Sequence, residues 1–82
     1  MTQTAIEDLK VTWALLFPEV AAPADQQWAL WLLLHDGATV RAGVAQLAAK
    51  YRRTDGRMDD GFMVRFASSV MNRMMREQKG AN

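Results

Sequence analysis

The chain has 82 residues and a formal net charge of +1, which is enough for one domain and one apolar core but not for two. The absence of cysteine excludes disulfides, thiolate metal sites and thiol nucleophiles, and it favours a reducing, cytoplasmic setting. The longest apolar run, residues 28–34, is far shorter than the ~20 residues of a membrane span, and the opening residues lack the basic start of a secretion signal.

The first predicted helix covers residues 4–17. Thr4 and Glu7 have the spacing of a capping box, in which each side chain satisfies a backbone N–H at a helix start. Pro18 ends the helix, because its ring lacks an N–H and disfavours helical backbone in the preceding residue. Apolar side chains at helical spacing form one stripe, and they are Ile6, Leu9, Trp13, Leu16 and Phe17.

The second predicted helix covers residues 24–35. Pro23 suits its first turn, and Asp25 places negative charge near its positive end. Because residues 28–34 are apolar on every side, we expect this helix to be central to the fold or partly covered by a partner. The sequence from His35 to Gly37 then breaks the pattern, with Gly37 suited to a left-handed cap and Asp36 to capping the next helix.

The third predicted helix covers residues 38–52, and its apolar residues repeat at i, i+4, i+7 and i+11 from Val40. Residues 53–57 have turn chemistry. A fourth helix over residues 59–79, capped by Asp59 or Asp60, has one apolar and one basic side.

The elements predict an all-α fold, a compact domain over residues 1–82. It has four helices, or three if the break at residues 35–37 is only a kink. The expected core contains Trp13, Trp28, Trp31, Leu47, Phe66 and Val70.

Charge is divided unevenly along the chain. Residues 1–36 carry one lysine against five carboxylates, and residues 37–82 carry nine basic side chains against four carboxylates. This asymmetry favours either an anion-binding face or attraction between the two halves, within one chain or between chains.

No pattern of residues predicts catalysis, a metal site or a cofactor. His35 is the only histidine, and its place in the last turn of a helix is explained by the helix dipole. Asp59 and Asp60 are adjacent, so they do not face each other as an acid–base pair. The five glycines form no nucleotide-binding fingerprint, and we expect neither an enzyme nor a small-molecule substrate.

Two groups of residues are candidates for binding. A basic surface on the third and fourth helices either binds phosphates or complements helix dipoles and keeps the domain soluble; its members are Lys50, Arg52, Arg53, Arg57, Arg65, Arg73 and Arg76. Met58 and Met75, at the borders of the apolar face, and Trp28 and Trp31, on the apolar second helix, are candidates for a protein interface.

Residues 40–75 resemble the closing helices of DnaD-like replication domains. The resemblance lies in the segment from Val40 to Tyr51, a short turn, and the aromatic–aliphatic segment from Phe62 to Arg73. It implies an accessory role in the DNA replication of a phage or mobile element, with DNA or replisome proteins as partners.

The sequence therefore supports two hypotheses. The first is a non-enzymatic protein-binding adaptor or regulator, able to self-associate, that uses apolar surface around residues 28–34 and on the fourth helix. The alternative is a DNA-binding accessory protein of phage or mobile-element replication that uses the basic surface.

Overall fold

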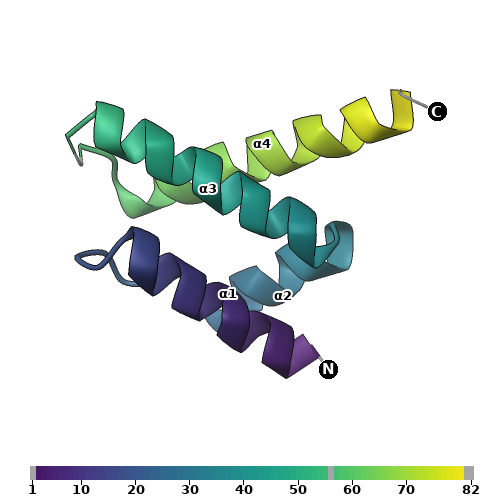
Figure 1. Ribbon diagram of the computed structural model, residues 1–82, viewed down its shortest axis with the longest axis horizontal. Coiled ribbons are helices and arrows are strands. Elements are labelled where there is room, and N and C mark those ends of the chain that lie inside the picture. Colours follow the sequence, from purple (N-terminus) through teal and green to yellow (C-terminus); the bar gives the residue numbers. More distant parts are fainter. Residues whose placement is uncertain (1, 56, 81–82) are drawn as a thin grey trace.

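The computed structural model describes residues 2–55 and 57–80, except for the side chains of residues 2, 3, 79 and 80. It contains four helices in these ranges: α1 (Thr2–Leu16), α2 (Asp25–Leu34), α3 (Gly37–Arg53) and α4 (Asp60–Gly80). Consecutive helices run in opposite directions (Figure 1). The predicted all-α fold is confirmed, and the break before α3 separates two helices.

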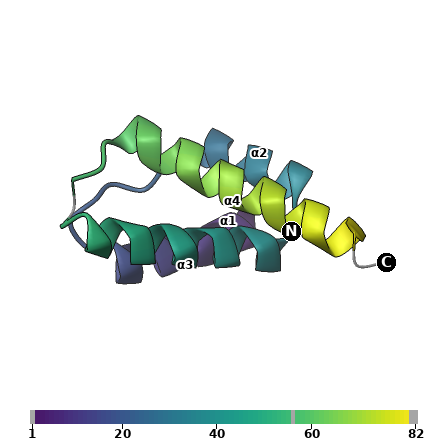
Figure 2. The ribbon, with the colours of Figure 1, turned by 90° about the horizontal axis from the view of Figure 1, so that it is seen from above.

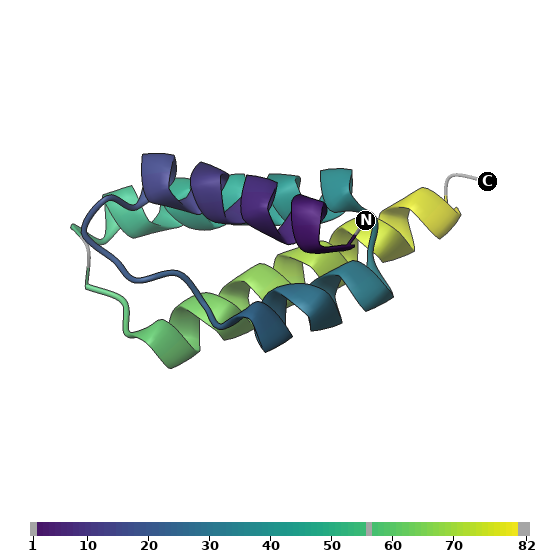
Figure 3. The same cartoon turned by 90° about the horizontal axis from the view of Figure 1, so that it is seen from below.

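The helices form two layers of two. α1 lies beside α3 in one layer, and α2 lies beside α4 in the other (Figures 2 and 3). α1 and α4 therefore occupy diagonally opposite corners, and every helix has one face toward the centre and another toward solvent. Helices of the same layer run in the same direction, because each layer joins helices that are two apart in the chain.

The start of α1 differs from the sequence prediction. The helix begins at Thr2, so Thr4 lies inside its first turn and the predicted capping box is wrong. Its end is as expected, because the last helical residue is Leu16, two positions before Pro18.

The junction between α2 and α3 is fixed by a side-chain cap. Asp36 Oδ1 accepts a hydrogen bond from the Thr39 backbone N–H at 2.7 Å, as predicted. Hydrogen bonds from Thr39 favour the ionised carboxylate and lower the pKa of Asp36 below its ordinary value. The prediction of a left-handed Gly37 is wrong, because Gly37 is the first residue of α3 and the residue that ends α2 is His35, in extended conformation.

The start of α4 is capped in the same way, by the Phe62 backbone N–H donating to Asp59 Oδ1 at 2.7 Å. The preceding turn is sharp, and Asp55 adopts a left-handed conformation with φ 55°, which aspartate tolerates better than most residues. Gly56, the glycine of the predicted turn, lies outside the described residues.

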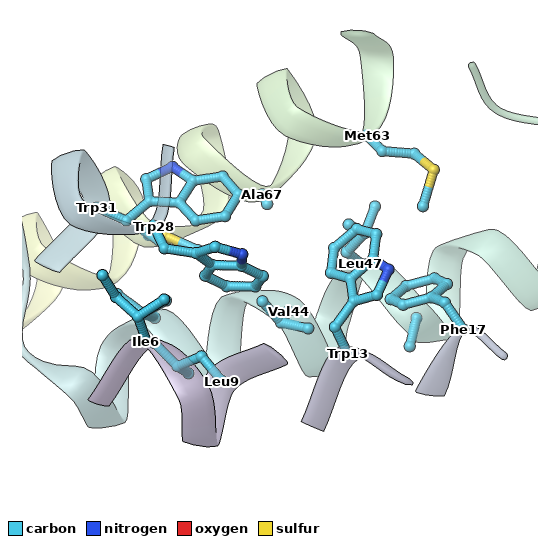
Figure 4. Close-up of a cluster of buried hydrophobic side chains, with 13 residues drawn as sticks. Ile6, Leu9, Trp13, Phe17, Trp28, Trp31, Val44, Leu47, Met63 and Ala67 are labelled. Atoms are coloured by element: carbon cyan, nitrogen blue, oxygen red, sulfur yellow. The ribbon is translucent and has the colours of Figure 1, made fainter. Parts of the chain in front are cut away.

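Five aromatic rings in contact run through the centre of the bundle. Tyr51 of α3 meets Phe17 edge-on at 5.2 Å between centroids, and Phe17 meets Trp13 of α1 at 4.3 Å. Trp13 then meets Trp28 of α2 at 6.0 Å, and Trp28 meets Trp31 at 5.2 Å, both edge-on. This aromatic chain ties three helices together around aliphatic core residues such as those in Figure 4.

All three indole N–H groups have acceptors. Trp13 donates to the Val20 carbonyl and Trp28 to the Pro23 carbonyl, each at 3.1 Å, so two core residues hold the long connection between α1 and α2. Trp31 Nε1 donates to Ser68 Oγ of α4 at 2.8 Å. The aromatic chain therefore reaches the fourth helix through a hydrogen bond.

Most of the predicted core is confirmed, since Trp13, Trp28, Trp31, Leu47 and Val70 are buried. Phe66 is the exception. It is only half-buried and packs against the periphery of the core.

The serine that accepts from Trp31 has a matched neighbour for a stability test. Ser68→Ala leaves a buried indole N–H without its partner, which costs about 1–3 kcal/mol. Ser69→Ala, at an exposed position one residue later, gains the same helix propensity without that loss. In urea unfolding followed by circular dichroism, we expect Ser68→Ala to be less stable than Ser69→Ala by at least about 1 kcal/mol; equal stabilities would contradict the role of this bond.

α3 and α4 are in close contact at Gly43. A Cβ built there would lie 2.7 Å from Met71 Cγ and 3.0 Å from Met71 Cε, closer than carbon atoms pack. The glycine therefore makes room for the methionine of the facing helix.

We expect Gly43→Val to lower the free energy of unfolding by about 2 kcal/mol through overpacking. The control is Ala45→Val, an exposed position on the same helix, where only the propensity cost of about 0.6 kcal/mol applies. Adding Met71→Ala to Gly43→Val should recover part of the loss in the same denaturation assay. A Gly43→Val variant as stable as Ala45→Val would show that the contact is loose.

Candidate protein-binding surface

Three exposed leucines project from α2. Leu33 is 81% exposed, Leu34 55% and Leu30 48%, although α2 has only ten residues. We call these three side chains the leucine face. Exposed leucines scattered singly are ordinary on protein surfaces, whereas a cluster on one short helix is a candidate binding surface.

A shallow groove runs beside the leucine face. It is lined by side chains of α2 alone: Gln26, Ala29, Leu30, Leu32 and Leu33. The small Ala29 lies between larger neighbours, which leaves a depression at the level where Leu30 and Leu33 project. The arrangement offers a depression and, beside it, apolar side chains that could fill a similar depression on another molecule.

The inward side of α2 explains why these leucines face solvent. Trp28, Trp31 and His35, spaced by three and four residues, are buried. With the indoles bonded to Pro23 and Ser68, the rotation of the helix about its axis is fixed. Leu30 and Leu33 then lie on the opposite side, because they are about half a turn from the buried residues.

Burial contradicts an interface role for the two tryptophans. Trp28 is 0% exposed and Trp31 is 2% exposed, so a partner cannot reach either ring. The predicted region of surplus apolar surface is nevertheless present, carried by the leucines between and after them.

The two methionines proposed for the interface are both half-buried. Met58 packs against the core from the connection before α4. Met75 lines a groove on α4, together with Val64, Arg65, Ser68, Ser69, Asn72 and Arg76. We call this second depression the arginine groove, because Arg65 and Arg76 stand at its two ends with small polar side chains between them.

The predicted basic surface is divided in the structure. Arg65 and Arg76 belong to the arginine groove, but Arg73 does not line it. Arg73 follows Phe62 and Phe66 by eleven and seven positions, which places it on the same stripe of the helix as these two rings.

A second small cluster lies where α3 and α4 meet. Phe62 and Phe66 are stacked with centroids 6.4 Å apart, and Lys50 Nζ lies 5.8 Å from the Phe66 centroid, within cation–π range. The three arginines at the end of α3 and in the next connection, Arg52, Arg53 and Arg57, are exposed. The basic residues therefore occupy the turn, the Phe62–Phe66 stripe and the arginine groove separately.

Ion pairs do not join the acidic and basic halves within the described part of the chain. The one salt bridge found there connects Lys10 to Asp25 at 2.8 Å, with both side chains substantially exposed, and such a pair contributes little to stability. Both partners belong to the acidic half. The acidic side chains of α1 and the basic side chains of α4 therefore lie at diagonally opposite corners of the bundle.

Two polar residues lie at the α2–α3 junction. His35 is buried and its Nδ1 has no hydrogen-bond partner, while the Asp36 carboxylate caps α3. Among residues 2–55 and 57–80, histidine and carboxylate side chains form no group of three that could hold a metal ion. No helix in these ranges is long and apolar enough to cross a membrane.

The sequence could partly predict which leucines of α2 are exposed. Once Trp28 and Trp31 are assigned to the core, Leu30 and Leu33 must lie on the other side of a helix. The sequence does not show which side is buried, because every residue from 28 to 34 is apolar.

Comparison with known proteins provides no relative. The chain matches no protein-family model, no curated protein and no solved structure at a significant level. The resemblance to DnaD-like domains stays a prediction.

Proposed function

We propose that the chain is a non-enzymatic adaptor or regulator that binds another protein chain through the leucine face of α2. The observation that carries this proposal is the exposure of Leu30, Leu33 and Leu34 beside a groove on the same helix. Burying one leucine side chain gains roughly 1.5–3 kcal/mol. A partner that covers all three therefore gains free energy that offsets part of the cost of association.

The polar residues support a binding role more than catalysis. Of the residues considered for acid–base chemistry, His35 is buried and the Asp59 carboxylate caps α4. Neither residue lines the α2 groove. The groove itself offers one polar side chain, Gln26, and otherwise apolar atoms, as expected for the centre of an interface.

The proposal can be tested with a photoreactive amino acid, p-benzoylphenylalanine, in place of Leu33. The matched control carries it in place of Leu15 of α1, which is 79% exposed against 81% for Leu33 but belongs to another helix. We expect irradiation of intact cells to give discrete protein adducts from position 33 and not from position 15. Equal labelling from both positions, or none from position 33, would refute the leucine face as a binding surface.

DNA binding is the second candidate, and the arginine groove is the observation that favours it. Arg65 and Arg76, eleven residues apart on α4, lie about 16 Å apart along the helix axis, and Ser69 and Asn72 lie between them. Cationic ends with hydroxyl and amide groups between them suit successive phosphates of a nucleic acid backbone. Under this hypothesis the partner is DNA, as the resemblance to replication domains implies.

If the chain binds DNA, fluorescence anisotropy should show saturable, salt-sensitive binding of labelled single-stranded or duplex DNA. Arg76→Glu should weaken binding about tenfold or more and flatten the salt dependence. Arg41→Glu, at an exposed arginine of α3 outside the groove, is the charge-matched control. Equal effects of the two variants would mean that only overall charge matters, and no binding at low salt would refute this candidate.

A further inference from the structure

We infer that the leucine face binds a second copy of this chain, with the α2 helices of the two copies packed antiparallel about a two-fold axis near Ala29 and Leu30. This inference rests on the proposed function, because it names the partner of the same face. The second copy is identified by three properties of α2: the shape of its surface, its lack of charge and its length.

The first property is self-complementary shape. In packing between helices, a side chain of one helix enters a hole formed by four residues of the other, at i, i+3, i+4 and i+7. Four of the residues that line the α2 groove have this spacing: Gln26, Ala29, Leu30 and Leu33. The hole is bounded by the same leucines that project from the face.

A two-fold axis makes each helix serve both roles. Leu30 of one copy enters the hole of the partner subunit, and by symmetry Leu30 of the partner subunit enters the hole of the first copy. Leu33 then lies beside Gln26 of the partner subunit, near the end of the contact. A closed two-fold interface requires one patch that complements itself, and α2 provides it.

The second property is the absence of charge on α2 after its first residue. Residues 26–34 contain no ionisable side chain, so two identical faces meet without placing like charges opposite each other. Asp25, at the edge, is paired with Lys10 of its own chain at 2.8 Å. The arginine groove is unsuitable for this symmetric contact, because it would set arginine against arginine.

The third property, the length of α2, sets the strength of the contact. Ten residues of helix span about 15 Å, so two such helices bury an area at or below the low end of specific interfaces, about 1,200 Å². Interfaces of this size are reversible. We therefore expect a dissociation constant in the micromolar range, with monomer and dimer exchanging rapidly.

Analytical ultracentrifugation of the purified chain between about 1 µM and 1 mM tests the inference. The weight-average mass of wild type should rise with concentration from 9.2 kDa toward twice that value. Leu33→Glu, which places like charges at both ends of the two-fold contact, should weaken association at least tenfold. Leu15→Glu, at an equally exposed leucine of α1, should associate like wild type.

Circular dichroism of both variants checks that they remain folded, as expected for substitutions of exposed side chains. A wild type that stays monomeric to 1 mM would overturn the inference. So would equal weakening by the two variants, because self-association would then not depend on α2.

A cysteine cross-link tests the position of the axis. The chain contains no cysteine, so Ala29→Cys introduces a single thiol. If the axis passes near Ala29, the two Cβ atoms come close enough for a disulfide, and mild oxidation should give mostly covalent dimer. Ala14→Cys, at an exposed alanine of α1, is the control, and equal cross-linking of the two variants would overturn the antiparallel arrangement.

Failure of this inference can be distinguished from failure of the proposed function. If the purified chain is monomeric while p-benzoylphenylalanine at position 33 captures one different protein in cells, the second copy is wrong and the adaptor role stands. If the captured protein is the chain itself, both are supported. If position 33 captures nothing and the chain is monomeric, both are wrong.

Discussion

The two indole hydrogen bonds of α2 decide how this small bundle divides into inside and outside. Seven successive apolar residues give α2 no polar side of its own, so burial of apolar area hardly distinguishes one rotation of the helix from another. The N–H groups of Trp28 and Trp31 do distinguish them, because each must find an acceptor once its ring is buried. The Pro23 carbonyl and the Ser68 hydroxyl provide these acceptors.

The exposed leucines follow from that choice and from the size of the domain. A chain of 82 residues buries a smaller fraction of its surface than a larger protein does, and in two layers of two helices each helix keeps one side in solvent. For α1, α3 and α4 that side is partly polar or charged. For α2 it is the leucine face, which adds to the exposed Val11 and Leu15 of α1.

The sequence predicts local features better than the rotation and grouping of side chains. Asp36 and Asp59 cap their helices as expected, because a cap depends on residues within one turn. The start of α1 differs from the prediction, since Thr4 is also compatible with the interior of a helix. The grouping of the arginines depends on more than sequence separation, because 100° per residue places Arg73 about 60–80° around the axis of α4 from Arg65 and Arg76.

The two functional hypotheses are compatible, because they use different helices. Dimerisation through α2 would leave the arginine groove of each copy on α4, so one assembly would carry two cationic grooves. A polyanion long enough to reach both would bind the dimer more tightly than either groove alone, without any new contact. A weak dimer would then make such binding depend on protein concentration, since only the associated form presents both grooves. Self-association through the leucines could in this way control the affinity of a charged site that contains none of them.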